Sequence, residues 1–346
     1  MRKTILTVIV LLFTASSILA AKVIPMDLYK PFRIRTDGER IFIGQGAEIF
    51  IYSANDFKLL KKFGKAGEGP QEFKLRPEFS PEIDVHTDTL VATSIGKVSF
   101  FTKDGKFLHE KKVTGIGLNQ FYRKLGDKLV GERFLSEKAN LYRAVSIYDS
   151  NLNKIKEIFQ YKYYIQRGKQ YNPIERGLYI ANFYIHDHKI FIGGEIDSGT
   201  IHVFNTDGNH LYNIQPKLEK VKFTEADKKG YIDSYLSNSE YARQYERIKN
   251  RFKYPDYFPL FQDFIAADKR IYIQTYKRDE TDTKNEFYIL TLKGELIKRV
   301  WLPLEEFWDF TPNPYAICNG KLYQVVDNQE EDMWELHISE VFKQVP

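Results

Sequence analysis

Short apolar runs recur along the chain, and a turn followed by a basic or polar residue precedes each of them. The six copies of this phrase are DGERIFIG (37–44), HTDTLVAT (86–93), GDKLVGE (126–132), DHKIFIG (187–193), DKRIYIQ (268–274) and NGKLYQV (319–325). Apolar runs of this length, bounded by turn residues and rich in β-branched and aromatic side chains, predict strands. Repetition of one such unit indicates an architecture of repeated sheets.

Each copy lies inside a longer unit in which we expect four strands. In the first unit these are FRIRTD (32–37), RIFIG (40–44), EIFIYS (48–53) and KLLKKF (58–63). Turn residues separate the strands, as in Asp104-Gly105 of the second unit, because glycine accepts positive φ at little cost. A four-stranded unit of about 40–50 residues is the size of one propeller blade.

The sixth unit has only three expected strands, YAIC (315–318), KLYQVVD (321–327) and WELHISEV (334–341). The segment KVIPMDL (22–28) precedes the first complete unit, and we expect it to supply the missing strand. Pairing the two ends would close the ring and remove exposed strand edges. The sequence therefore predicts an all-β, six-bladed β-propeller over residues 22–346.

One segment, residues 224–252, lacks the pattern of apolar runs and turns that predicts strands elsewhere. Thr224 and Asp227 have the spacing of a capping box, and aromatic and aliphatic residues then recur at helical spacing. The residues on this face are Tyr241, Tyr245, Ile248 and Phe252. We expect a small helical insertion between blades 4 and 5.

The first unit ends in Phe63-Gly64-Lys65-Ala66-Gly67-Glu68-Gly69-Pro70-Gln71-Glu72-Phe73. This segment resembles the inter-blade signature of bacterial secreted six-bladed β-propeller proteins of the NHL-repeat-like class, in which FG runs into a G-x-G-P-G-E-F turn. Gln71 replaces the last Gly of the pattern. The resemblance implies the fold and a bacterial origin. It leaves function open, because such propellers include lyases, lactonases and binding proteins.

Residues 1–21 have the three parts of a secretory signal peptide. Arg2 and Lys3 are basic, an apolar run follows, and small residues lead to Ala20 and Ala21. The alternative is an uncleaved anchor, but the apolar run is short for a bilayer. We expect export to the periplasm or the medium, with no membrane span after cleavage.

Composition excludes some partners. Without Arg2 and Lys3 the chain has 49 basic residues against 46 acidic ones, and the charges are interspersed, so we expect no nucleic acid partner. Cys318 is the only cysteine, which excludes an intrachain disulfide. Cys318 falls in or just after an expected strand, and we expect it to be a small, buried hydrophobic side chain.

Three groups of residues are candidates for chemistry. Gly64, Gly67 and Gly69 form a turn rather than a phosphate loop, because no helix follows them. His186-Asp187-His188 falls at an expected hairpin turn, where adjacent side chains rarely converge on one ion, so we assign no metal ligands and no cofactor. Calcium-dependent lactonases of related propeller shape hold their ion in the central channel, and Asn119, Asn182 and Asp263 are the candidates for such a Ca²⁺ site here.

Two aromatic segments interrupt the blade pattern. The first contains Tyr161, Tyr163, Tyr164, Arg167 and Tyr171, between the third and fourth units, and the second contains Tyr254, Tyr257 and Phe258, after the helical segment. Tyrosine and arginine are frequent contact residues. The alternative is that these rings form a satellite core beneath the insertion.

Two functions follow from these patterns. The first is an exported, non-catalytic binding or scaffold protein that recognises a peptide, glycan or protein partner on the face of the inter-blade connections. The alternative is a metal-dependent, lactonase-like hydrolase or lyase with its site in the central channel.

Overall fold

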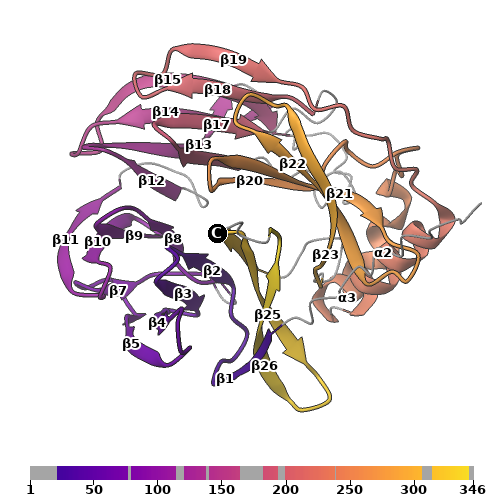
Figure 1. Ribbon diagram of the computed structural model, residues 1–346, viewed down its shortest axis with the longest axis horizontal. Helices are drawn as coiled ribbons and strands as arrows, with labels where there is room; N and C mark the ends of the chain where they lie inside the picture. The colour runs from indigo at the N-terminus through magenta and orange to yellow at the C-terminus, as the bar shows by residue number, and fades with distance from the viewer. Residues whose placement is uncertain are drawn as a thin grey trace, which may run out of the picture.

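Six four-stranded antiparallel sheets surround a common axis in the computed structural model (Figure 1). The structure describes residues 22–76, 79–113, 121–137, 140–163, 182–193, 199–237, 239–305 and 314–342. The six-bladed, all-β propeller predicted from the repeated phrase is confirmed. Within the described residues, no helix is long and apolar enough to cross a membrane.

The strands of each blade run in chain order from the axis outward. Blade 1 contains β2 (Arg33–Thr36), β3 (Arg40–Gln45), β4 (Glu48–Ser53) and β5 (Leu59–Phe63). Blade 2 contains β8 (Glu82–Val85), β9 (Thr89–Ser94), β10 (Lys97–Thr102) and β11 (Phe107–Lys112). Blade 3 contains β12 (Phe121–Leu125), β13 (Lys128–Glu137), β14 (Asn140–Tyr148) and β15 (Lys154–Tyr163). Blade 4 contains β16 (Asn182–His186), β17 (Lys189–Gly193), β18 (Ile201–Asn205) and β19 (His210–Ile214). Blade 5 contains β20 (Asp263–Ala267), β21 (Arg270–Arg278), β22 (Lys284–Thr291) and β23 (Leu296–Pro303). Blade 6 contains β24 (Tyr315–Cys318), β25 (Lys321–Asn328) and β26 (Met333–Glu340).

The N-terminal strand completes blade 6, as the sequence predicts. β1 (Lys22–Met26) pairs antiparallel with β26, with Ile24 opposite Leu336. Around the axis, neighbouring inner strands lie side by side, and β24 lies beside β2. The ring therefore closes through a sheet that joins the two ends of the described chain.

The inner strands bury alternate residues between neighbouring blades. Ile34 packs with residues of blades 1 and 6, and Ile83 with residues of blades 1 and 2. Phe183 and Phe264 occupy the matching positions farther around the ring and are fully buried. Because side chains alternate along a strand, the remaining residues of these inner strands point to the opposite side. Of these, Ile265, Tyr315 and Ile317 lie in the core shared by blades 5 and 6.

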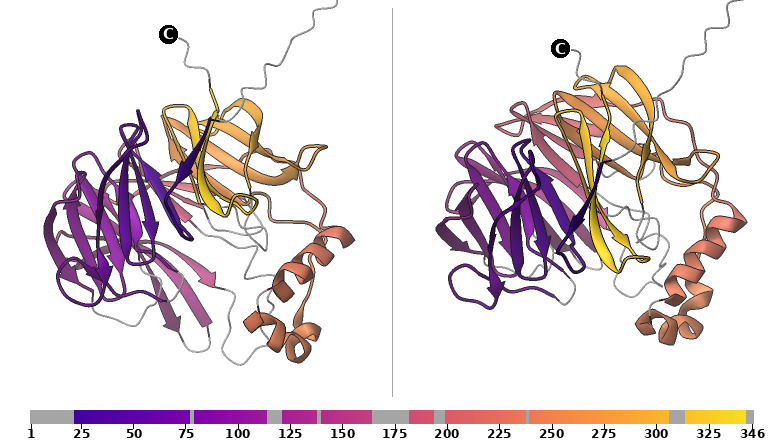
Figure 2. Two further views of the ribbon diagram at one scale, coloured as in Figure 1. Left: turned by 90° about the horizontal axis from the view of Figure 1, so that it is seen from below. Right: turned by 60° about the horizontal axis from the view of Figure 1, so that its bottom comes forward.

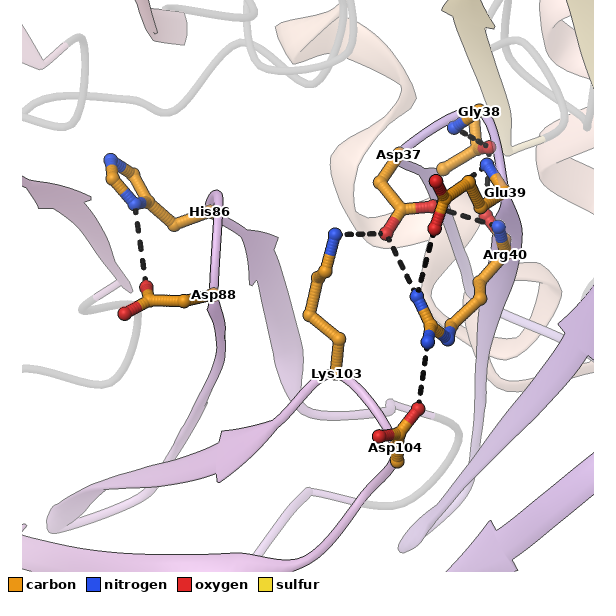
Figure 3. Close-up of polar contacts among 9 residues, drawn as sticks. Asp37, Gly38, Glu39, Arg40, His86, Asp88, Lys103 and Asp104 are labelled. Atoms are coloured by element: carbon orange, nitrogen blue, oxygen red, sulfur yellow. Dashed lines mark hydrogen bonds and ion pairs between the residues drawn. The ribbon is translucent and has the colours of Figure 1, made fainter.

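Antiparallel pairing gives the ring two different faces. Each inner strand starts where the preceding blade's outer strand ends, and we call this side the loop face. The short turns after each inner strand lie on the opposite side, the turn face. On the turn face, Asp37 pairs with Lys103 at 2.7 Å and Arg40 with Asp104 at 2.8 Å, which joins blades 1 and 2 (Figure 3).

The predicted hairpin at 186–188 is also on the turn face. Asp187 and His188 both have positive φ, as a tight two-residue turn requires. The Nε2 atom of His186 accepts a hydrogen bond from the backbone N–H of Lys269 in the next blade, at 2.8 Å. This histidine therefore joins blade 4 to blade 5.

The helical insertion between blades 4 and 5 is confirmed, and it consists of two helices. α2 (Glu225–Ser237) and α3 (Ser239–Ile248) precede the 3-10 turn η1 (Lys249–Arg251), and both helices project from the ring (Figure 2). The capping box forms: the backbone N–H of Thr224 donates to the Asp227 carboxylate at 2.7 Å, and the backbone N–H of Asp227 donates to the Thr224 hydroxyl at 3.3 Å.

The glycine-rich signature after blade 1 is structural. β6 (Lys65–Ala66) pairs in parallel with β7 (Glu72–Phe73), and the Glu72 carboxylate accepts the Gly69 N–H at 2.8 Å. The buried ammonium of Lys97 donates to the Gly69 carbonyl at 2.5 Å. An extended strand follows the glycines, so the turn predicted here is confirmed.

Candidate functional site

The six inner strands all run from the loop face to the turn face, so the side chains on this second side of the strands fall into layers. The first layer holds Arg33, Glu82, Phe121, Asn182, Asp263 and Tyr315. The second layer holds Arg35, Asp84, Arg123, Tyr184, Ile265 and Ile317. The polar side chains of both layers are here called the axial belt: Arg33, Glu82, Asn182, Asp263 and Tyr315 of the first layer, and Arg35, Asp84, Arg123 and Tyr184 of the second.

Polar contacts of the axial belt pass from each blade to the next. Arg33 of blade 1 forms a two-pronged ion pair with Glu82 of blade 2, in which Nε lies 3.0 Å from Oε2. Asp84 of blade 2 lies 3.7 Å from the Nη1 atom of Arg123 in blade 3. Arg123 in turn donates a long hydrogen bond of 3.5 Å to Asn182 in blade 4.

The belt continues through blades 4, 5 and 6. The Asn182 amide donates to Asp263 at 3.4 Å and to the Tyr184 hydroxyl at 3.1 Å. The Tyr315 hydroxyl of blade 6 donates to the second oxygen of Asp263 at 3.2 Å. Contacts therefore link the inner strands of all six blades, which places these side chains together at the axis.

The Asp263 side of the belt is held by neutral groups. Burial raises the pKa of the Asp263 carboxyl above its ordinary value, although the backbone N–H of Phe264, Asn182 and Tyr315 all donate to it. Burial also raises the pKa of Tyr184 to about 12 and that of Tyr315 well above its ordinary value. Both phenols therefore remain protonated donors at neutral pH.

The opposite side of the belt is rich in arginine. Burial alone would raise the pKa of Glu82, but the charge and hydrogen bonds of Arg33 outweigh it, so the pKa is lowered and the pair is ionised. Arg123 is only 7% exposed, and its guanidinium lies over the rings of Tyr184 at 4.6 Å and Phe183 at 5.2 Å.

Two arginines of the belt have buried N–H groups that are not used. The Nε atoms of Arg35 and Arg123 are inaccessible to solvent and have no hydrogen-bond partner among the described residues. The hydrogen bond of Arg35 runs from Nη1 to the backbone carbonyl of Ile34, at 2.8 Å. Buried donors are normally satisfied, so these two unpaired N–H groups are an unusual feature of the belt.

The first predicted aromatic segment belongs partly to a sheet. We expected Tyr161 and Tyr163 in a connection between blades. Instead, β15 extends to Tyr163, so both residues lie in the outer strand of blade 3. Tyr161 is half-buried against the core between blades 3 and 4. Tyr164, Arg167 and Tyr171 lie outside the described residues, as does Asn119.

The second aromatic segment divides between core and surface. Phe258 is buried and stacks on Tyr276 at 4.4 Å, and Tyr254 packs in the same cluster beneath the helices. These two rings follow the satellite-core alternative. Tyr257 is 50% exposed and is the member of this segment that a partner can reach.

The proposed calcium ligands are partly brought together. Asn182 and Asp263 meet, as their contact of 3.4 Å shows. Within the part of the chain that the structure describes, however, no three His, Cys, Asp or Glu side chains are grouped as metal ligands. Three arginines share the belt with Asp263, and their positive charge opposes a divalent cation.

Arg33, Arg35 and Arg123 were not selected from the sequence. The first two alternate within FRIRTD, a pattern that also suits a strand with one face in water. The signal that was available is their position in first strands, which a closed propeller turns toward its axis. Cys318, at the other end of β24, is half-buried, and burial raises the pKa of its thiol to about 11.

One comparison with a solved structure supports the fold. A DUF4221 family member from Bacteroides vulgatus is similar over 92% of this chain and 97% of its own, with 12% identity and a TM-score of 0.51. Hsv2 of Kluyveromyces lactis matches 91% of this chain and 75% of its own at 11% identity and a TM-score of 0.41. BamB from Moraxella catarrhalis matches 88% of this chain and 71% of its own at 10% identity and a TM-score of 0.31.

The chain matches no protein-family model and is similar in sequence to no curated protein. At such identities the similarity to the Bacteroides vulgatus protein concerns the fold alone. Function has to be argued from the site.

Proposed function

We propose that this protein is an exported bacterial binding protein, without catalytic activity, that recognises a peptide, glycan or protein partner on its loop face. The observation that carries the proposal is the axial belt, in which two arginines keep buried donors free while the other polar groups bind one another. Convergent polar groups with donors left unpaired are typical of ligand sites.

Aromatic rings near the belt support recognition at this face. Phe32 directly precedes the inner strand of blade 1, Phe79 lies three residues before that of blade 2, and their ring centroids are 4.9 Å apart. The Arg33 guanidinium lies over Phe32 at 4.4 Å, and Phe79 is 42% exposed. Rings beside cationic groups suit peptides and sugars, which combine apolar faces with polar edges.

The test uses the purified protein on defined glycan and peptide arrays. We expect a restricted set of array members to bind, and we expect Phe79→Ala on the loop face to weaken that binding. Lys58→Ala on the turn face, at an exposed position directly before β5, is the control and should leave binding unchanged. Equal loss in both variants, or no binding by the unaltered protein, would contradict the proposal.

The same preparation tests the hydrolase or lyase alternative. A panel of lactone and ester substrates is assayed with and without added Ca²⁺. Turnover that disappears on chelation would replace the binding proposal with the catalytic one. A thermal unfolding temperature that is unchanged by Ca²⁺ would argue against a bound ion, because a ligand of the folded state raises stability.

A further inference from the structure

Arg35 is the least compensated charge of the axial belt. Arg33 is paired with Glu82, and Arg123 lies 3.7 Å from Asp84. Among the described residues, no acidic oxygen lies within 4.0 Å of Arg35. Arg35 is half-buried, and a cation withdrawn from water without an anion is costly, so folded proteins normally provide a partner for it.

The charges around Arg35 do not balance it. Burial and the like charge of Arg123 lower the pKa of the Arg35 guanidinium, and Tyr184 and Glu82 offset only part of this effect. Arginine nevertheless remains protonated at any physiological pH. The repulsion would be relieved by an anion that contacts Arg35 and Arg123 together.

The geometry of Arg123 suits the second half of such a site. Its guanidinium plane is fixed by rings at 4.6 Å and 5.2 Å, and it is more than nine-tenths buried. Its Nε–H is unused, and its bond to Asn182 is long at 3.5 Å. A fixed arginine with spare donors is the group that binds carboxylates in a forked geometry.

The surrounding acids limit the charge of the anion. Three arginines face Glu82, Asp84 and Asp263, so the belt has one excess positive charge at most, when Asp263 is protonated. A monoanion matches this excess, whereas a phosphate dianion would meet repulsion from the neighbouring carboxylates. The phenols of Tyr184 and Tyr315 add protonated hydroxyl groups to the same region.

We propose that the axial belt binds a carboxylate of the ligand between Arg35 and Arg123. This inference rests on the proposed binding function and names the chemical class of the partner: a peptide with an acidic side chain or terminus, or a glycan containing a uronic acid. The carboxylate supplies the missing counter-charge.

The experiment measures thermal unfolding and calorimetric binding with sodium acetate, sodium D-glucuronate, sodium phosphate and sodium chloride at equal ionic strength. We expect acetate and glucuronate to raise the unfolding temperature saturably, relative to chloride, and phosphate to have a smaller effect. A free acidic sugar and an acidic peptide, N-acetyl-aspartate amide, compared at equal concentration, distinguish the two sources of the carboxylate.

Two variants separate binding from folding. Arg35→Gln removes the uncompensated charge, so in chloride its unfolding temperature should equal or exceed that of the unaltered protein. It should lose at least about tenfold in affinity for glucuronate, as expected when a charge-assisted hydrogen bond is removed. Arg40→Gln removes a turn-face arginine and should keep the unaltered affinity.

Three results would overturn the inference: no response of the unaltered protein to either carboxylate, an equal response in Arg35→Gln, or a stronger response to phosphate than to glucuronate. These results are independent of the array experiment. Carboxylate binding without any array partner would support the carboxylate site and contradict the wider recognition function. Array binding that is unchanged in Arg35→Gln would support recognition and contradict the carboxylate site.

Discussion

Glu132 is a buried carboxyl group in blade 3, close to the axial belt. It lies in β13, opposite Phe121 of the inner strand, and is 1% exposed. Burial raises its pKa to about 7, even though Arg143 forms a close ion pair with it. The folded protein therefore binds this proton more tightly than the unfolded chain does.

The raised pKa predicts a dependence of stability on pH. The contribution of the protonated Glu132 is fully present below pH 4.5, its unfolded value, and is lost as the pH rises through about 7. The loss amounts to about 3 kcal/mol at most, since one pKa unit corresponds to about 1.4 kcal/mol. Urea denaturation between pH 4.5 and pH 8 measures it.

Glu132→Gln should flatten this pH dependence, because the amide does not titrate in the range. Glu157→Gln, which removes an exposed carboxyl from strand β15 of the same blade, is the matched control and should retain the slope of the unaltered protein. If the slope persists in Glu132→Gln, another group is responsible for it.

Single residues of the site were the hardest feature to predict from sequence. Asn182 and Asp263 were selected because they begin inner strands, and the structure brings them together. Arg35 and Arg123 lie 88 positions apart in the sequence, and they become neighbours only because the ring places their strands about one axis. No local pattern carries that information.

At the scale of elements, most strands were predictable because apolar runs and turn glycines mark them. The outer strand of blade 3 was not predicted to its full length. Two irregularities in its pairing with β14, near Val145 and Ile147, shift the alternation of exposed and buried residues. Tyr161 and Tyr163 consequently resembled a connection instead of a strand end.

The signature loop after blade 1 gives a prediction for an element. Gln71 has a φ of 60°, in the left-handed region, at the position where the pattern has glycine. A side chain there costs about 1–2 kcal/mol, partly offset by the greater entropy that glycine loses on folding. Gln71→Gly should therefore stabilise the protein by up to about 1 kcal/mol.

Denaturant titration measures this difference, and Gln160→Gly supplies the comparison. Gln160 lies inside β15, where glycine weakens a strand, so that variant should lose stability. A destabilised Gln71→Gly would mean that the glutamine side chain contributes contacts that outweigh its backbone strain.

At the scale of the whole molecule, the pairing of β1 with β26 decides whether the ring is closed. Met26 is buried in the core shared by blades 1 and 6, whereas Val23 of the same strand is 47% exposed. Met26→Ala should cost about 2–5 kcal/mol, as other buried truncations do. Val23→Ala should change stability by less than about 0.5 kcal/mol.

Equilibrium unfolding of the two variants checks this prediction. Similar small losses would indicate that the terminal strand contributes little to the closed ring. The sequence predicted the closure correctly because the sixth unit lacked one strand and the chain had one unused strand at its start.

The pairing of β1 and β26 also sets an order of events during synthesis. β1 is made before every other strand of the propeller, yet its partner is made last. It must remain unpaired while five blades form, and contacts so distant in sequence are slow to form. During that interval, the nascent protein has an open strand edge that a chaperone, or a second chain, can occupy.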